Sequence, residues 1–213
     1  MTSEHVPASR MTGPGSPHHP ARQITAVNYA GAVELLDAML PALNAGTRPA
    51  AVVVASNSAV LVPVHEPLLS ALLKSPPGGP DGDNADAGTS TRSATGIGTS
   101  TGTGTGGMTA YAMSKLALIR AVRGRAQTWA ARGVRLNAVA PGPVQTPLLQ
   151  ASLADPVLGP LTQALPVPLG RPAKPAEIAD VVTFLLGPAS AYIHGSVLFA
   201  DGGTDALLRP DAF

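Results

Sequence analysis

Three short, largely apolar runs, separated by stretches with helical periodicity, constrain the fold of this chain most. The runs cover residues 50–55, 134–139 and 196–200. The first is continuously apolar, as in a parallel strand that is buried on both faces. Helical patterns flank the runs, at residues 24–43, 65–74, 110–132, 147–165 and 175–186. This alternation predicts an α/β fold with a doubly wound parallel sheet. Pro156 and Pro160 are expected to break the fourth helical stretch into shorter pieces.

Composition narrows the class of protein further. The chain has 213 residues and a hydrophobic fraction of 45%, so one domain with an ample core is expected. The net charge of +1 gives no reason to expect binding to nucleic acid or to a membrane surface. The chain has no cysteine, which excludes disulfides and thiolate metal sites. It also lacks an apolar stretch of ~18 residues, so a cytoplasmic protein is expected.

Two segments have a composition that cannot form a packed core. Residues 1–22 are rich in Pro, His, Ser and Gly and are expected to be a disordered head, followed by the domain at residues 23–213. Residues 75–107 carry Pro and Gly, then Asp and Asn, then a Thr-Gly repeat, and are expected to be a flexible insertion. Residues 93–98 imitate a phosphate-binding glycine turn, but no strand precedes them and no helix follows.

A tyrosine and a lysine four positions apart begin the central helical stretch. Residues i and i+4 share one helix face, so the ammonium of Lys115 can lie beside the phenol of Tyr111. A phenol needs a pKa shift of ~2–3 units to exchange protons near neutrality. A cation about 4 Å away supplies up to ~4 kcal/mol at an effective dielectric of ~20. The pair predicts an acid/base site, with a buried Tyr and a solvated Lys as the structural alternative.

Polar residues follow the first two predicted strands at their carboxyl ends, where ligands bind in open α/β sheets. Ser56 ends the first strand, and its hydroxyl can bond a substrate carbonyl, although Ser58 has the same chemistry. After the second strand comes Pro-Gly-Pro at residues 141–143, which by itself is a turn. Glycine at position 142 would let the backbone approach a flat ring, and Thr146 could bond a carboxamide. The histidines (His5, His18, His19, His65 and His194) form no group with metal-ligand spacing, so no metal site is expected.

Five segments in order resemble the short-chain dehydrogenase/reductase family. The resemblance rests on residues 27–31 (Val-Asn-Tyr-Ala-Gly), 51–56, the Tyr111/Lys115 helix, 134–147 and 201–203 (Asp-Gly-Gly). Residues 34–43 and 205–213 are most similar to the bacterial 3α-hydroxysteroid dehydrogenase/carbonyl reductases and the coniferyl-alcohol dehydrogenases. The resemblance implies a Rossmann-type fold and hydride transfer between NAD(P)(H) and a secondary alcohol or carbonyl compound, with NAD favoured and NADP not excluded.

The resemblance also implies residue roles. Tyr111 would be the acid/base, Lys115 would lower the pKa of the phenol and hold the nicotinamide ribose, and Ser56 would orient the carbonyl. Asn28, in the middle of a helix, would bend it and hold a water for a proton relay. The nicotinamide would lie against the segment that follows the second strand, at Pro141, Gly142, Val144 and Thr146. Residues 148–165 would form an apolar substrate flap that suits a steroid or an aromatic alcohol.

Family members carry about eighty further residues before the matching part, with the first strand and the pyrophosphate-binding glycine turn. The fold is therefore expected to be N-terminally truncated, with one sheet edge exposed. We expect a small-molecule substrate, and a homodimer or association through this exposed edge. The rival interpretation is a catalytically silent remnant that docks onto a complete dehydrogenase.

Overall fold

The sheet consists of three parallel strands. A computed structural model describes residues 16–74 and 105–212. In these residues the strands β1 (Ala50–Val54), β2 (Arg135–Pro141) and β3 (Val197–Ala200) pair in the order β1-β2-β3. Ala50 pairs with Arg135 in the first ladder, and Ala138 pairs with Val197 in the second. The three strands that the sequence predicts are thus confirmed.

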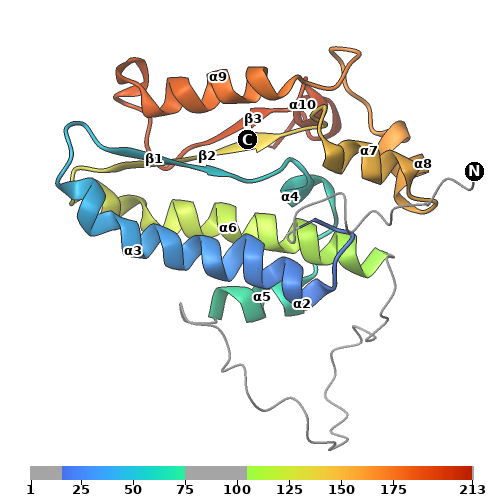
Figure 1. The fold of residues 1–213 in the computed structure, drawn as a ribbon, viewed down its shortest axis with the longest axis horizontal. Helices are drawn as coiled ribbons and strands as arrows, with labels where there is room; N and C mark the ends of the chain where they lie inside the picture. Colours follow the sequence, from blue (N-terminus) through green and yellow to red (C-terminus); the bar gives the residue numbers. More distant parts are fainter. Residues whose placement is uncertain (1–15, 75–104, 213) are drawn as a thin grey trace, which may run out of the picture.

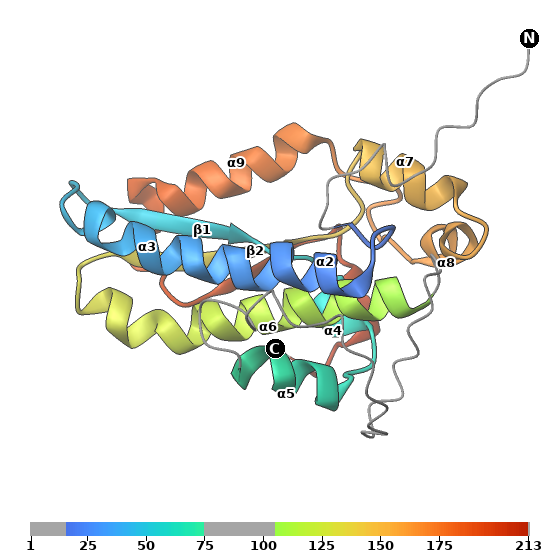
Figure 2. The ribbon, with the colours of Figure 1, turned by 60° about the horizontal axis from the view of Figure 1, so that its bottom comes forward.

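Helices cover both faces of this sheet (Figure 1). Helix α9 (Pro175–Leu186) lies along one face and contacts β1 and β2. Helix α6 (Thr105–Ala130) packs on β2 from the other side. Helices α3 (Ala32–Asn44) and α5 (Glu66–Lys74) lie against α6, one on each side of it in the turned view of Figure 2. This arrangement confirms the predicted doubly wound α/β fold.

Short helices gather at the carboxyl ends of the strands, namely α4 (Ser58–Leu61), α7 (Pro147–Ala154), α8 (Leu158–Ala164) and α10 (Thr204–Leu208). A 3-10 turn, η2 (Pro188–Ser190), follows α9. The expected break near Pro156 is present between α7 and α8. Pro160 does not break the helix, because it lies in the first turn of α8, where a backbone N–H would have no intrahelical hydrogen-bond partner.

The helical stretch predicted at residues 24–43 is continuous but not uniform. It begins with α2 (Ala21–Thr25), continues as a π-helical segment η1 (Ala26–Gly31), and then becomes α3. A π segment inserts a wider turn into a helix and is frequent at functional sites. Asn28 lies in this π segment, and the bend expected there stays a prediction.

The core lies mainly on the α6 side of the sheet. Met113 and Ala117 of α6 are buried with Leu69 of α5 in one cluster. Trp129, near the end of α6, is buried with Leu136 of β2 in a second cluster. Helix α6 is therefore fixed along its whole length, which holds its amino-terminal turns at the carboxyl ends of the strands.

Strand β1 is less buried than the sequence suggests. We expected a strand covered on both faces, but no residue of β1 is fully buried, and Val54 is 50% exposed. The reason is the position of β1 at the edge of the three-stranded sheet, where among the described residues it pairs only with β2. The apolar sequence of β1 is that of an interior strand, whereas its position is that of an edge strand.

The structure differs from the expected disordered head at residues 16–22. Ser16 and His18 are buried, and the Pro17 carbonyl lies so close to Gly107 of α6 that a β-carbon there would collide with it. Residues 1–15 and most of the expected insertion, residues 75–104, lie outside the described residues. In the described part of the chain, no helix combines the length and the hydropathy needed to cross a membrane.

Candidate active site

The candidate site lies beyond the carboxyl ends of β1 and β2. The ladder continues past β1, because the N–H of Ala55 donates to Val139 (2.8 Å) and that of Asn57 donates to Pro141 (2.9 Å). These bonds fix the turn that carries Ser56 next to the end of β2. A cleft of about 450 Å³ opens here between the strand ends, α6 and α7. Its lining includes seven of the eight predicted site residues, namely Ser56, Tyr111, Lys115, Pro141, Gly142, Val144 and Thr146.

Ser56 and Ser58 have distinguishable places. The Oγ of Ser56 accepts hydrogen bonds from the backbone N–H of Ser58 (3.2 Å) and from its hydroxyl (3.0 Å). The Ser56 side chain lies near the Tyr111 phenol, where hydrogen bonding acts to lower the pKa of Tyr111. Ser56 is thus the serine beside the phenol, and Ser58 supports Ser56 from behind.

The Tyr111 phenol is held in a desolvated position. Burial raises its pKa above the ordinary value, while the hydrogen bond with Ser56 acts in the opposite direction. The Nζ of Lys115 lies 5.7 Å from the centre of the Tyr111 ring, one helical turn further along α6. The i, i+4 spacing therefore brings the two side chains together.

Lys115 is oriented by the backbone of β1. Its Nζ donates a hydrogen bond of 3.0 Å to the carbonyl of Val54, the last residue of the edge strand. Burial lowers the pKa of Lys115 to about 8, since no carboxylate offsets the loss of water. The lowering of the Tyr111 pKa that we expected from Lys115 stays a prediction.

Asn28 reaches the site indirectly. Its Nδ2 lies 3.3 Å from the Oγ of Ser114, which in turn donates to the backbone carbonyl of Tyr111 (2.7 Å). The π segment η1 contacts α6 and carries Asn28 to this point. Asn28 does not line the cleft itself, so the structure places it behind the Tyr111 turn.

The segment after β2 is shaped by its neighbours. A β-carbon at Gly142 would lie 2.8 Å from the α-carbon of Asp201. The backbone that follows β3 therefore requires glycine at this position, in addition to any close approach of a flat ring. Val144 forms a bridge with Ala173. The hydroxyl of Thr146 donates to the Val144 carbonyl and caps α7 by accepting from the N–H of Leu149 (3.4 Å).

Some residues of the site have no clear signal in the sequence. Asn57 is buried in the cleft wall, with its amide 3.5 Å from Asp201 at the end of β3, and its position beside Ser56 was the only indication. Ser152 also lines the cleft, and His18 lies against it. A histidine in a Pro-rich head carries no sequence pattern that predicts such a contact.

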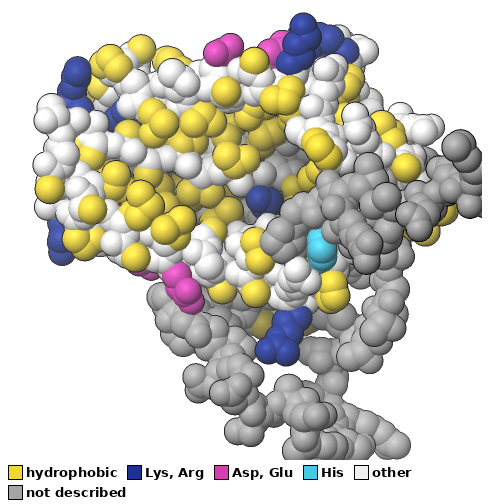
Figure 3. Space-filling view, in the orientation of Figure 1, with side chains coloured by type: hydrophobic (Ala, Val, Ile, Leu, Met, Phe, Trp, Pro, Cys, Tyr) yellow, Lys and Arg dark blue, Asp and Glu magenta, His cyan; other side chains and the backbone are white. Residues whose placement is uncertain are grey.

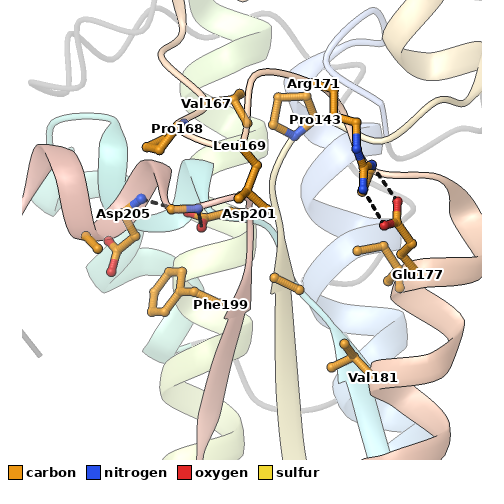
Figure 4. Close-up of a pocket in the computed structure, with 16 residues that line it drawn as sticks. Pro143, Val167, Pro168, Leu169, Arg171, Glu177, Val181, Phe199, Asp201 and Asp205 are labelled. Carbon is orange, nitrogen blue, oxygen red and sulfur yellow. Dashed lines mark hydrogen bonds and ion pairs between the residues drawn. The ribbon is translucent and has the colours of Figure 1, made fainter.

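A larger cavity of about 600 Å³ lies elsewhere, between β3 and α9 (Figure 4). Its wall is mainly apolar, with Phe199 and Val181 facing it. At its rim Arg171 and Glu177 bond each other at 2.6 and 2.7 Å. The other two charged residues of its lining also have partners, since Asp205 pairs with Arg209 and Asp201 accepts backbone N–H groups. Within residues 16–74 and 105–212, no cluster of three potential metal ligands exists.

Comparison with known proteins identifies the family. A family model described as Enoyl-(Acyl carrier protein) reductase matches residues 92–205, more than half of the chain. The 3-alpha-hydroxysteroid dehydrogenase/carbonyl reductase of Comamonas testosteroni is 46% identical over 191 residues, which are 89% of this chain and 68% of that protein. The cis-4-hydroxycyclohexanecarboxylate dehydrogenase of Sinomonas cyclohexanicum is 38% identical over 46% of this chain and 39% of its own length.

Among solved structures, the 3-alpha-hydroxysteroid dehydrogenase from Pseudomonas sp. B-0831, complexed with NADH, matches with a TM-score of 0.75. It is 40% identical, and the match covers 95% of this chain and 73% of that structure. The chain therefore belongs to the short-chain dehydrogenase/reductase family, whose members are NAD(P)-dependent oxidoreductases.

Proposed function

We propose that this chain transfers a hydride reversibly between NAD(H) and a hydrophobic secondary alcohol or ketone, such as a steroid or an aromatic alcohol. One observation carries the proposal: Ser56, Tyr111 and Lys115 converge in a cleft whose wall also contains the segment from Pro141 to Thr146. The relatives named as 3-alpha-hydroxysteroid dehydrogenases support the choice of a ketone with a large apolar body.

The residues present fit one half of a dinucleotide. Pro141, Gly142, Val144 and Thr146 would hold the nicotinamide, and Lys115 would hold its ribose. No strand in the described residues is followed by the three spaced glycines that bind a pyrophosphate. We expect weak binding of NADH by this chain alone, because residues 16–74 and 105–212 do not provide several charge-assisted hydrogen bonds of ~1.5–3 kcal/mol each. The preference for NAD over NADP rests on the relatives.

In the proposed reaction, the bound nicotinamide supplies the hydride or takes it. The Ser56 hydroxyl and the Tyr111 phenol hold the carbonyl oxygen by hydrogen bonds, and Tyr111 gives its proton to this oxygen. The ammonium of Lys115 favours the phenolate that remains. Asn28 would hold a water that relays protons from Lys115. Its contact with Ser114, whose hydroxyl donates to the backbone carbonyl of Tyr111, would keep Asn28 behind the α6 turn. In the direction of oxidation each proton moves the other way.

The apolar cleft wall supports a hydrophobic substrate. Leu148, Leu149, Leu165 and Ile178 line the cleft beside the catalytic residues, and Met108 closes it from α6. A ligand that fills such a wall gains ~25 cal/mol for each Å² of apolar surface removed from water. We also propose that the protein is cytoplasmic and forms a homodimer.

The alternative function is that of a silent chain which docks onto a complete dehydrogenase. One observation favours it: the edge of β1 is unpaired among the described residues, although its sequence is that of an interior strand. Co-purification with a full-length dehydrogenase, together with a lack of NADH oxidation by the isolated chain, would support this alternative.

The proposal is tested by NADH oxidation with hydrophobic ketones at millimolar NADH. Tyr111→Phe should lower turnover by about 10²–10⁴, with little change in NADH affinity. Lys115→Met should reduce both turnover and NADH affinity, because the lysine has both roles. Tyr192→Phe is the matched control, since Tyr192 is fully exposed and remote from the cleft. Full activity in Tyr111→Phe would falsify the assignment.

A further inference from the structure

A buried polar cluster joins the segment before α2 to the substrate flap. His18 is 4% exposed and Ser152, on α7, is 9% exposed. The Nε2 of His18 lies 3.4 Å from the Oγ of Ser152, and its Nδ1 lies 3.6 Å from Oδ2 of Asp155. Ser152 lines the cleft that contains Tyr111, and among the other α7 and α8 residues of its lining only Thr162 is polar.

The carboxylate of Asp155 determines how the cluster is protonated. Its Oδ1 accepts the N–H groups of Val157 (2.8 Å) and Leu158 (2.9 Å), which anchors it at the start of α8. Its Oδ2 faces the Nδ1 of His18, which has no hydrogen-bond acceptor within bonding distance. Coulomb attraction favours an N–H on Nδ1, so in the neutral ring Nε2 is an acceptor.

Ser152 must then use its single proton for His18. With its O–H donated to Nε2, the Ser152 oxygen has only lone pairs left for a ligand in the cleft. A ligand group that donates a hydrogen bond is matched to this oxygen, whereas a carbonyl group would meet it lone pair to lone pair.

The position of Ser152 along α7 sets where this donor belongs on the ligand. Ser152 lies six residues after Thr146, a rise of ~9 Å along the helix. Leu148 and Leu149 lie between them and line the cleft. A ligand that reaches from the nicotinamide end to Ser152 therefore has an apolar body and a remote polar group.

We propose that Ser152, oriented by His18 and Asp155, is a subsite that takes a hydroxyl group of the substrate remote from the reacting carbon. This inference rests on the proposed function. Ser152 is the binding residue, and His18 is a positioning residue that acts through it. The substrate class becomes hydroxylated apolar ketones rather than apolar ketones in general.

A hydrolytic role for the same three residues does not fit the geometry. Ser152 lies inside α7, where the neighbouring backbone N–H groups are bonded within the helix. An acyl-transfer site needs such donors free to hold an oxyanion. The cluster therefore orients a hydroxyl and does not activate a nucleophile.

The test compares two steroids that differ only at the remote position, 17β-hydroxy-5α-androstan-3-one and 5α-androstane-3,17-dione. Calorimetric titration of the whole chain without cofactor should give about five-fold tighter binding of the hydroxysteroid, as one net hydrogen bond provides. Ser152→Ala should bring the affinity ratio close to one while binding of the dione changes little. His18→Phe should lower the affinity ratio as well, because the Ser152 hydroxyl no longer donates to His18 and can donate to the ligand carbonyl instead.

Thr162→Val is the matched control, because Thr162 presents another hydroxyl to the same cleft from α8. It should keep the five-fold ratio. If His18 or Ser152 had only a structural role, its variant would bind both steroids more weakly by the same factor, and the affinity ratio would stay unchanged. The proposal is overturned if the ratio is unchanged in these variants, if the wild-type chain binds the dione more tightly, or if neither steroid binds.

The pH dependence gives an independent readout. Burial lowers the pKa of His18, Asp155 acts to raise it, and the neighbouring His19 lowers it further. The neutral ring therefore persists to a lower pH than in an exposed histidine. Once the ring is protonated, Nε2 donates to Ser152, whose proton then turns to the ligand. The affinity ratio should thus shift toward the dione at acidic pH in the wild type but not in Ser152→Ala.

These titrations separate the subsite from the reaction. If the ratio behaves as expected and no NADH is oxidised with either steroid, the subsite stands and the proposed function fails. If NADH is oxidised with both steroids and Ser152→Ala leaves the ratio of kcat/KM unchanged, the reaction stands and the subsite is wrong.

Discussion

Lys115 connects two parts of the molecule through a single nitrogen. Its Nζ bonds the Val54 carbonyl at the end of β1 and lies 5.7 Å from the ring of Tyr111. The residue is half-buried in the cleft, and this burial lowers its pKa to about 8. The charge that the proposed chemistry uses is therefore lost within the pH range in which such enzymes are measured.

We expect kcat/KM for ketone reduction to fall as the pH rises through about 8, where Lys115 loses its proton. Lys115→Arg should move this limb to higher pH, because a guanidinium stays charged (ordinary pKa above ~12). A pH–rate profile of the two proteins checks this. An unchanged limb in Lys115→Arg would show that another group causes it.

The lowered pKa of Lys115 also predicts how stability changes with pH: stability should rise with pH, whereas kcat/KM should fall. The unfolded chain holds the Lys115 proton up to the ordinary value of 10.5, whereas the folded chain releases it near 8. Between these values the unfolded state binds more protons, so the free energy of unfolding should gain a favourable contribution from Lys115 as the pH rises. Denaturant titrations of wild type and Lys115→Met across this range measure that contribution, which the variant should lack.

Two neighbouring serines provide a matched pair. Ser56→Ala should lower turnover by about 10²–10³, as for the loss of one donor to a developing oxyanion. Ser58→Ala should cost far less, because Ser58 bonds Ser56 rather than Tyr111. Steady-state kinetics of the two variants decide between the serines. A larger loss in Ser58→Ala would reverse the assignment that the geometry favours.

Residue types in the site were predictable where spacing or strand position determines them. The i, i+4 rule brings Tyr111 and Lys115 together, and the strand end identifies Ser56 and Ser58 as candidates. The Val54 acceptor and the desolvation of Tyr111 were not predictable, since both depend on tertiary packing. The same is true of His18, whose burial arises from contacts with residues more than a hundred positions away.

At the scale of elements, the turn between α7 and α8 is held by one side chain. Asp155 accepts the N–H of Val157, which precedes α8, and that of Leu158, its first residue, and it faces His18. This turn defines the flap at the cleft, so its stability bears on how firmly the flap is placed.

Asp155→Ala should lower the free energy of unfolding by about 1–2 kcal/mol, as for the loss of a helix cap. Asp180→Ala, at an exposed position of α9, is the control and should change it by less than about 0.5 kcal/mol. Urea titration of the three proteins gives these differences. Equal values for Asp155→Ala and Asp180→Ala would contradict the capping role.

The three strands and the longer helices followed from periodicity to within about five residues, whereas the short helices α4 and α10 were not predicted. The limits of that method appear at η1, where a π segment interrupts a helical pattern that looks uniform in sequence. They appear again at Pro160, which the first turn of α8 accommodates. Periodicity identifies the buried side of an element but does not report the local winding of its backbone.

At the scale of the whole molecule, the edge of β1 is the most unusual surface. Hydrophobic side chains gather across this side of the molecule, over β1 and the helices that flank it (Figure 3). Exposed hydrophobic side chains of these elements are Val54 of β1, Leu35 and Met39 of α3, and Phe184 of α9, each between 42% and 59% exposed. An edge strand with such surroundings is a template for pairing with another chain.

We expect this chain to self-associate through the β1 side at micromolar concentrations. Leu35→Lys should weaken association, because it places a charge on an apolar contact surface. Leu161→Lys, at a similarly exposed position on α8, is the control (60% exposed, against 59% for Leu35). Sedimentation velocity over a range of concentrations measures the effect. A wild-type chain that stays monomeric throughout would contradict this expectation.

The central proposal for this protein is hydride transfer in the cleft that contains Ser56, Tyr111 and Lys115. The decisive measurement is the mass of the product alcohol after incubation of the chain with a hydrophobic ketone and millimolar NADH that carries deuterium at both C4 positions. We expect deuterium on the new carbinol carbon in the wild type, with a rate lower by about 10²–10⁴ in Tyr111→Phe. An alcohol without deuterium, or equal rates in the two proteins, would contradict this proposal.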